Sequence, residues 1–341
     1  MTIVTKKALI STMSRASIQS PPSKASPAPA EFADNVVWAA WLYYNDELTQ
    51  AEIAARLHVS RATVVNYLQE ARRLGIVTIR LDPQLVGRTE LANMLCERFD
   101  LEAATVFPSI EEQPSHRTVG RAGARVLSTL LEPGDRLGVA WGRTILSAAR
   151  AVEYNGIGDL TIVQLAGSSS STQDFAPELC TSLMANALQA RCANLHAPAV
   201  VTSKEVRDLF LKEPALVRQF ELIHSVNKVV YGVGDLEADS TFADSQLMSS
   251  DRLEAIRREG RAIGVLLGQF IGPDGEPVQG PIDDRLIGLK VEELSKIPQR
   301  ICLAGGARKY PAIRAVLRGR LATHLVTDSD TATALLEDEL A

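Results

Sequence analysis

One predicted helix begins with four hydrogen-bonding side chains close together: Ser60, Arg61, Thr63 and Asn66. An arginine can bond both acceptors on the edge of a guanine, and an asparagine can bond an adenine edge in two places. Serine and threonine hydroxyls suit phosphate oxygens. A helix that exposes these groups on its leading turns has the chemistry to read base edges in a major groove.

Capping signals define the elements that would position this helix. A first helix is predicted over 31–45, and Thr49 stands three residues before Glu52, the spacing of a capping box that opens a second helix. Ser60 can cap the third helix, and Gly75 stands where a left-handed C-terminal cap is expected. A helix, a tight turn and a second capped helix form the arrangement that enters DNA by its N-terminal residues. The predicted DNA-binding residues are Thr49, Gln50, Ser60, Arg61, Thr63, Asn66 and Tyr67.

The positive charge of the chain is local. The formal net charge of -5 and the pI near 5.7 argue against a protein that coats nucleic acid or anionic membrane indiscriminately. Around the third helix, however, Arg56, Arg61, Arg72 and Arg73 outweigh Glu70. An ordinary three-helix bundle with solvated arginines is the alternative interpretation. Two caps, a tight turn and a basic face together favour DNA binding.

Four glycine-bearing loops follow predicted strands in the larger, C-terminal part of the chain. Short apolar runs alternate there with helical stretches, which predicts a doubly wound, largely parallel α/β sheet. In such a sheet ligands bind beyond the carboxyl ends of the strands. The predicted strands are 104–107, 136–140, 161–165, 228–231, 300–304 and 324–327. The predicted ligand-binding residues in the loops are Gly142, Arg143, Thr144, Gly167, Ser168, Gly232, Gly234, Asp235, Gly305, Gly306 and Lys309.

These loops offer a site for an anionic or hydroxyl-rich ligand. Glycine lets the backbone approach a ligand, and a following helix presents unpaired N–H groups to an anion. Arg143, Thr144 and Lys309 add donors where a phosphate could sit, and Asp235 could hold sugar hydroxyls. A turn alone would explain each single glycine equally well. The 142–144 segment lacks the first glycine and the lysine of a nucleotide-binding P-loop, and 232–234 lacks the third glycine of a dinucleotide fingerprint, so no cofactor is predicted.

Length and composition predict more than one domain. The 341 residues, 46% of them hydrophobic, are divided into a disordered tail over 1–30, a helix-turn-helix domain over 31–82, a connecting helix over 83–101 and a ligand-binding and oligomerisation domain over 102–341. The tail is rich in Ser, Ala and Pro, and a transit peptide is the alternative. Four scattered cysteines predict reduced thiols in a cytoplasm and no metal site. No apolar run reaches the roughly 20 residues that cross a membrane.

Several of these segments resemble one family. The stretch WLYYNDELTQAEIAARLHVSRATVVNYLQEARRLGIVTIRL at 41–81 is similar to the DNA-binding segment of the SorC family of sugar-responsive bacterial regulators. The likeness continues in GDRLGVAWGRT at 134–144, VVYGVGDLEADSTF at 229–242 and AGGARK at 304–309, and it covers roughly 36–338. The resemblance implies that the helix opening at Ser60 is the recognition helix, that the loops hold a sugar or sugar phosphate on a fold like that of sugar-phosphate isomerases, and that the protein is a tetramer. Some relatives have glycine or serine in place of Trp141 and Arg143, so the indole could line the sugar pocket instead.

The sequence therefore predicts a transcriptional regulator of a carbohydrate or polyol catabolic operon. It would bind operator DNA, respond to a sugar, polyol or sugar phosphate, and assemble as a dimer or tetramer, because one helix-turn-helix contacts few base pairs. An enzyme is not expected, since the histidines are scattered and no nucleophile elbow, zinc motif or cysteine-histidine signature occurs. A sugar-phosphate isomerase or deaminase and an effector-independent DNA-binding protein are the alternatives.

Overall fold

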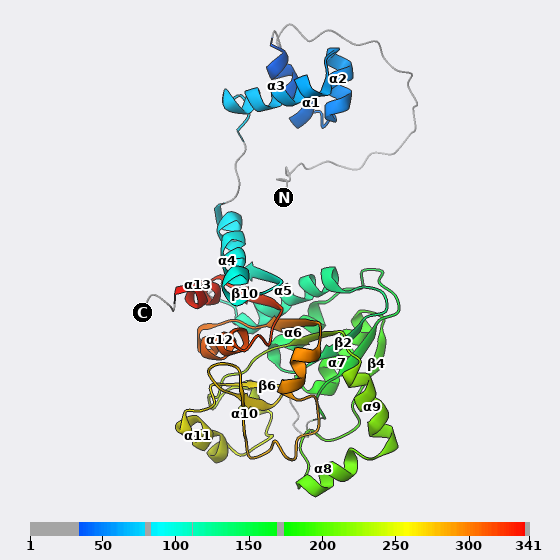
Figure 1. Cartoon of the computed structure of the whole chain (residues 1–341), viewed down its shortest axis with the longest axis vertical. Coiled ribbons are helices and arrows are strands. Elements are labelled where there is room, and N and C mark those ends of the chain that lie inside the picture. The colour runs from blue at the N-terminus through cyan, green and yellow to red at the C-terminus, as the bar shows by residue number, and fades with distance from the viewer. Residues whose placement is uncertain (1–33, 79–82, 111, 169–173, 338–341) are drawn as a thin grey trace. The chain divides into compact units, whose positions relative to one another are not determined.

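The computed structural model describes residues 34–78, 83–110, 112–168 and 174–337. The predicted tail over 1–30 and the end of the predicted DNA-binding segment, 79–82, lie outside these residues. Contacts divide the chain into two compact units, Met1–Leu81 and Asp82–Ala341, which are described separately (Figure 1). No helix in the described ranges is long and apolar enough to cross a membrane.

The first unit is a three-helix bundle of α1 Asn35–Tyr44, α2 Gln50–Leu57 and α3 Arg61–Arg73. His58 ends α2 in a left-handed conformation with φ 54°, which makes the tight turn before α3. Gly75 takes φ 72° just beyond α3, where the sequence predicts a left-handed residue. The apolar positions of the three helices meet in one core made of Trp38, Ala39, Ala40, Leu42, Ile53, Ala54, Val64, Leu68 and Ala71.

A seven-stranded sheet, with every neighbouring pair parallel, forms the centre of the second unit. Its strand order is β1-β10-β9-β5-β2-β3-β4, which confirms the predicted doubly wound α/β fold. The strands are β1 Ala103–Phe107, β2 Arg136–Val139, β3 Thr161–Gln164, β4 Arg191–Ala193, β5 Lys228–Tyr231, β9 Gln299–Leu303 and β10 His324–Asp328. The sequence predicts all of them to within a residue except β4, which is too short and too exposed to form an apolar run.

Helices cover both faces of this sheet. On one face lie α5 Ser115–Leu130, α6 Arg143–Ala151 and α7 Pro177–Ala187, and on the other α4 Pro83–Phe99, α9 Pro214–His224, α12 Tyr310–Arg318 and α13 Ser329–Glu337. The remaining helices are α8 Lys204–Phe210, α10 Thr241–Asp244 and α11 Ser250–Glu259, with 3-10 turns η1 Val291–Lys296 and η2 Ala307–Lys309. The predicted connecting helix is α4, and it belongs to the second unit.

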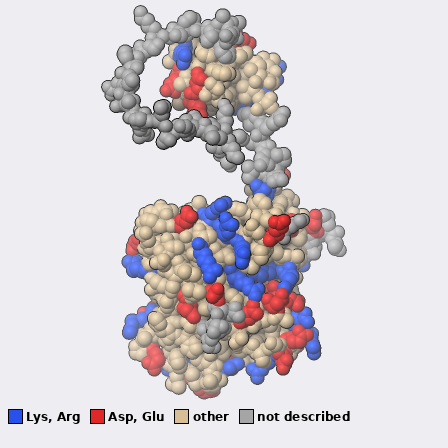
Figure 2. Space-filling view, turned by 180° about the vertical axis from the view of Figure 1, so that it is seen from behind, with Lys and Arg blue, Asp and Glu red and all other residues tan. Residues whose placement is uncertain are grey.

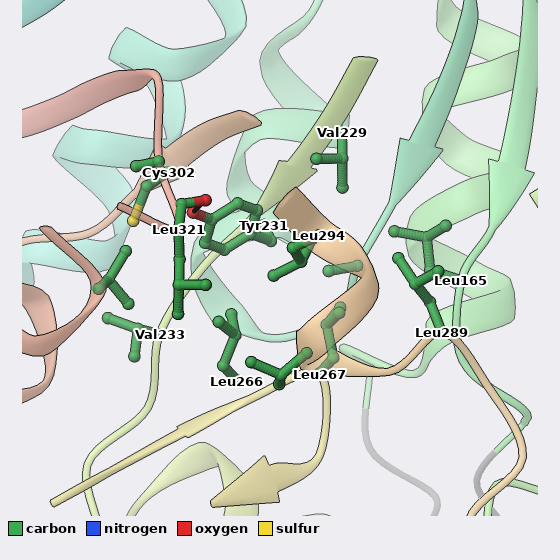
Figure 3. Close-up of a cluster of buried hydrophobic side chains, with 14 of the residues drawn as sticks. Leu165, Val229, Tyr231, Val233, Leu266, Leu267, Leu289, Leu294, Cys302 and Leu321 are labelled. Carbon is green, nitrogen blue, oxygen red and sulfur yellow. Dashed lines mark hydrogen bonds between the residues drawn. The ribbon is translucent and has the colours of Figure 1, made fainter. Parts of the chain in front are cut away.

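Successive residues of the central strand β5 enter opposite cores. Val229 and Tyr231 pack with α4, α9, α12 and α13, whereas Val230 packs with α5, α6 and α7. The ring of Tyr231 is fully buried among aliphatic side chains (Figure 3). Its hydroxyl donates to the carbonyl oxygen of Leu321 at 2.7 Å, which satisfies this buried polar group.

A small antiparallel sheet, β6 Gly264–Leu266, β7 Gln269–Ile271 and β8 Pro277–Val278, is not predicted from the sequence. Strands of two or three residues are too short to show an alternating pattern, although Asp274-Gly275 is a hairpin signal. The β6–β7 hairpin turns through Leu267 and Gly268, both with positive φ (53° and 81°). A bridge between Gly234 and Val265 fixes this sheet at the carboxyl end of β5.

Charge on the second unit is unevenly distributed. Figure 2 shows Lys and Arg side chains gathered over part of one face, with Asp and Glu side chains among and below them. The net charge of -5 therefore coexists with local positive surface.

A buried ion pair ties the beginning of β5 to the segment before β2. The Nζ of Lys228 lies 2.9 Å from Oδ2 of Asp135, and both residues are buried. Asp135 also accepts hydrogen bonds from the backbone N–H of Glu132 and the amide of Asn227, and Lys228 donates to the carbonyl of Leu130. Because the site is closed to water, either charge would be left without a partner if the other were removed.

Asp135→Ala is expected to lower the free energy of unfolding by about 3–5 kcal/mol, because it leaves the Lys228 ammonium buried and unpaired. The double variant Asp135→Leu with Lys228→Met should lose much less. Urea denaturation of the full chain, followed by circular dichroism, measures both. Glu259→Ala, which breaks an exposed ion pair with Arg261, is the control and should change stability little. A single variant as stable as the double one would contradict this role of the pair.

Candidate functional site

The helix α3 opens with a capped, exposed first turn. Its N-cap is Ser60, whose hydroxyl accepts a hydrogen bond from the backbone N–H of Thr63 at 3.0 Å. The side chains of Ser60, Arg61 and Asn66 are exposed, and that of Thr63 is half-buried. Of the predicted contact residues, Arg61 and Asn66 are the long polar side chains that project from the surface of this helix.

The helix α2 is held against α3 by its cap and by one contact between side chains. Thr49 and Glu52 form a complete capping box, with bonds in both directions, and this hydrogen bonding holds the pKa of Glu52 below its usual range. The Nε of Arg61 donates to Oε1 of Gln50 at 3.3 Å. Thr49 therefore caps α2, and Gln50 orients Arg61.

Tyr67 is the predicted contact residue that the bundle absorbs most. Its ring packs against the core of the first unit, and it is half-buried. Farther along α3, Arg72 donates to the hydroxyl of Tyr44, and Arg73 pairs with Glu70. The end of α3 therefore has its charges engaged within the bundle.

The second unit brings three of the four predicted glycine loops together. They follow β2, β5 and β9, which are neighbours in the sheet, so their carboxyl ends lie side by side. The chain runs from β2 toward β3 but from β5 toward β9, so the strand order reverses between β2 and β5. A reversal of this kind is where doubly wound sheets open a crevice for ligands.

Two adjoining cavities fill this crevice. The first, about 470 Å³, is lined by Gly142, Arg143, Thr144, Gly232, Gly234 and Lys309 of the predicted set. The second, about 820 Å³, is lined by Arg143, Asp235, Gly305, Gly306 and Lys309. The remaining two predicted residues, Gly167 and Ser168, line neither cavity.

Gly167 has a structural reason to be glycine. A Cβ atom there would lie 2.5 Å from the carbonyl oxygen of Pro198, and its N–H donates to the carbonyl of Ile287. Ser168 exchanges backbone hydrogen bonds with Ala197 and Ala199. This loop joins two backbone segments, and Gly167 faces only a separate apolar recess.

Gly142 and Gly305 shape the crevice itself. Gly142 has φ 118°, which disfavours any side chain, and it begins α6 without a side-chain cap. A Cβ on Gly305 would lie 2.2 Å from Oδ2 of Asp328 and 2.9 Å from Oγ of Ser115. The amino end of α6 is therefore open toward the cavity that Gly142, Arg143 and Thr144 line.

Lys309 lies at the junction of the two cavities. Burial lowers the pKa of its ammonium, and this effect outweighs the opposing attraction of Asp235. Among the described residues, its side chain has no hydrogen bond or ion pair within bonding distance. A half-buried cation beside an uncapped helix start is suited to an anionic ligand.

The two arginines of the crevice are already engaged by acids. Arg143 pairs with Asp244 and lies 5.9 Å from the centre of the Phe175 ring. Arg308 pairs with Asp239 at 2.6 Å and with Asp235 at 3.1 Å. The Arg308 hydrogen bonds hold the pKa of Asp239 below its usual range, so both acids stay ionised.

The crevice includes residues that the sequence analysis does not select. His116, at the start of α5, has a pKa lowered by burial and then by the positive charges of Lys309, Arg143 and Arg117, which shows that the mouth is electropositive. His116 and Arg308 occupy loops after strands, so the rule that finds Lys309 could have found them. Thr241 and Leu267 come from α10 and the small hairpin, and only the fold brings them here.

Family models match both units of this chain. Residues 84–337 match a model described as "Putative sugar-binding domain", and residues 39–84 match one described as "MarR family". The uncharacterized transcriptional regulator YjhU of Escherichia coli K12 is 35% identical over 314 residues, which cover 90% of this chain and 95% of that protein. The transcriptional regulator LsrR of Klebsiella pneumoniae is 30% identical over 305 residues, covering 88% and 92%.

A solved full-length structure has the same two-part organisation. The sorbitol operon regulator SorC from Klebsiella pneumoniae superposes with a TM-score of 0.68 at 26% identity, over 88% of this chain and 97% of that one. Its likeness extends over both the helix-turn-helix unit and the parallel-sheet unit. The relatives are named as transcriptional regulators rather than as enzymes. This chain belongs to the SorC family of sugar-responsive transcriptional regulators.

Proposed function

We propose that α3 reads operator DNA through Arg61 and Asn66, and that the crevice holds a phosphorylated sugar or polyol that controls this binding. The observation that carries the effector assignment is Lys309, a half-buried cation without a protein partner among the described residues. It lines the same cavity as the uncapped start of α6. A bound phosphate would satisfy both the cation and the helix N–H groups.

The DNA contact requires more than one copy of the chain. One helix-turn-helix covers few base pairs, so useful specificity calls for a dimer or tetramer on a repeated or palindromic site. Thr49, Ser60 and Thr63 contribute caps and phosphate contacts, and Gln50 steadies Arg61. The protein would act in the cytoplasm, where its operator lies.

The polar groups of the crevice divide between a phosphate and sugar hydroxyls. Lys309 and the backbone amides that begin α6 suit the phosphate. Asp235, buried and ionised beside Arg308, offers a carboxylate to hydroxyl groups of the carbon chain. The relative named as a sorbitol operon regulator supports a carbohydrate or polyol operon as the target.

Two ion pairs provide a route from effector to conformation. Arg143 is held by Asp244 and Arg308 by Asp239, and both acids belong to the segment that includes α10. A phosphate competes with these carboxylates for the same guanidinium groups. The effector would thereby favour a second arrangement of the 235–244 segment, which gives the differential affinity that coupling to DNA requires.

Arg61→Ala and Asn66→Ala are each expected to weaken operator binding by about 1–3 kcal/mol and to relax the preference for one base pair, because each removes a base contact. Fluorescence anisotropy with fragments of the gene's own promoter region, and with single base substitutions in them, measures both effects. Arg73→Ala, on the same helix but paired with Glu70, is the matched control and should retain sequence preference. Unchanged affinity in both variants would remove them from the base-reading role.

Lys309→Met is expected to weaken binding of a phosphorylated effector at least ten-fold, because it removes a charge-assisted hydrogen bond of about 1.5–3 kcal/mol. Operator affinity without effector should stay the same. A thermal-shift screen of phosphorylated and free sugars and polyols identifies ligands, and calorimetry compares the variant with Lys204→Met, an exposed lysine outside the crevice. Loss of DNA binding together with the effector response would mean that Lys309 is structural.

A further inference from the structure

An apolar recess adjoins the phosphate-facing cavity. Trp141, Leu267 and Gly268 line both spaces, so a ligand in the larger cavity has its neighbouring end at the recess. The remaining walls come from α7, from the loop after β3 and from the segment after α10. They include Ala166, Phe175, Ala176, Ala199, Leu247 and Leu286.

The few polar groups of the recess are already satisfied. Ser245 contributes its one side-chain hydroxyl, which donates to the carbonyl of Phe242 at 2.6 Å. The backbone N–H of Gly167 donates to the carbonyl of Ile287 at 2.9 Å. A hydroxyl or charged group that entered would lose its water without gaining a partner. The recess therefore favours hydrocarbon over hydroxyl.

The walls of the recess are fixed before any ligand arrives. Trp141 stacks on Phe175 with ring centres 6.3 Å apart and planes 17° from parallel. Phe175 is buried, and the guanidinium of Arg143 lies over its ring. Leu267 is held at φ 53° by the tight β6–β7 turn, a conformation that is unfavourable for leucine. This turn places a bulky aliphatic side chain where the two spaces meet.

We propose that this recess receives a hydrocarbon group of the effector, so that the effector is a phosphorylated deoxy- or alkyl-bearing sugar or polyol. The inference rests on the proposed function, because the phosphate at Lys309 fixes which end of the ligand faces Trp141. The recess is small, with room for about one methyl or methylene group. It therefore selects for a missing hydroxyl or an added methyl rather than for a large aglycone.

Matched pairs of sugar phosphates test the recess on the full chain. Calorimetry compares 2-deoxy-D-ribose 5-phosphate with D-ribose 5-phosphate, 2-deoxy-D-glucose 6-phosphate with D-glucose 6-phosphate, and 1-deoxy-D-xylulose 5-phosphate with D-xylulose 5-phosphate. In at least one pair, the deoxy member is expected to bind about ten-fold or more tightly than its hydroxylated partner. The gain combines one buried hydrocarbon group with the rejected hydroxyl.

Two variants change the recess in opposite directions. Ala176→Val fills it, and the backbone of Ala176 (φ -59°, ψ 148°) before Pro177 accepts a β-branched residue. It should abolish the preference for the deoxy member while leaving the hydroxylated partner and operator binding unchanged. Leu247→Ala enlarges the recess and should favour an ethyl over a methyl substituent. Thermal melting confirms that each variant is folded.

The outcomes separate this inference from the proposed function. If sugar phosphates bind and depend on Lys309, but the hydroxylated member of every pair binds as well as or better than the deoxy member, the recess proposal is wrong and the phosphate site stands. A deoxy preference that survives Ala176→Val would also overturn it. If no member of any pair binds, the effector class is wrong, and both proposals fail.

Discussion

The reversal of strand order between β2 and β5 is the constraint on which the second unit depends. These strands are neighbours, yet the chain leaves them in opposite directions along the sheet. The loops that follow must diverge, which leaves a crevice between them. Gly142, Gly232 and Gly306 let the backbone shape that crevice, and the small hairpin at Leu267 and Gly268 closes one side. No single loop would form a site without its neighbours.

Electrostatics decides what this crevice can hold. Arg143 and Arg308 are neutralised by Asp244, Asp239 and Asp235, whereas Lys309 has no such partner in the described part of the chain. Burial disfavours the charged form of Lys309, so an anion that relieves this cost binds favourably. The same aspartates are kept ionised by their arginines. This arrangement suits reversible binding better than proton transfer, in agreement with relatives that are regulators.

Reading DNA and sensing a ligand place different demands on the two units. The first unit needs exposed polar side chains on a rigid support, and it obtains this with two side-chain caps and a small apolar core. The second needs a cavity whose groups can exchange partners. Its ion pairs near α10 are of this exchangeable kind, while the buried Lys228 and Asp135 pair at the other end of β5 is not, since water cannot replace either partner.

The sequence by itself determined the elements whose causes are local. Caps at Thr49 and Ser60, the left-handed Gly75 and the apolar strands depend on neighbours within a few residues, so their pattern is visible in the chain. The glycine loops, Lys309 and the resemblance of 41–81 to a DNA-binding segment were visible for the same reason. They were sufficient to predict the family.

Only the tertiary structure decided which of these residues meet. Gly167 follows a strand as the others do, but its role is close packing against Pro198. Arg143 appears free in the sequence, yet Asp244, about a hundred residues away, engages it. The apolar recess joins Trp141, Phe175 and Leu267 from three separate segments. Contacts of this kind depend on strand order and hairpin placement, which are set by packing of the whole domain and leave no local pattern.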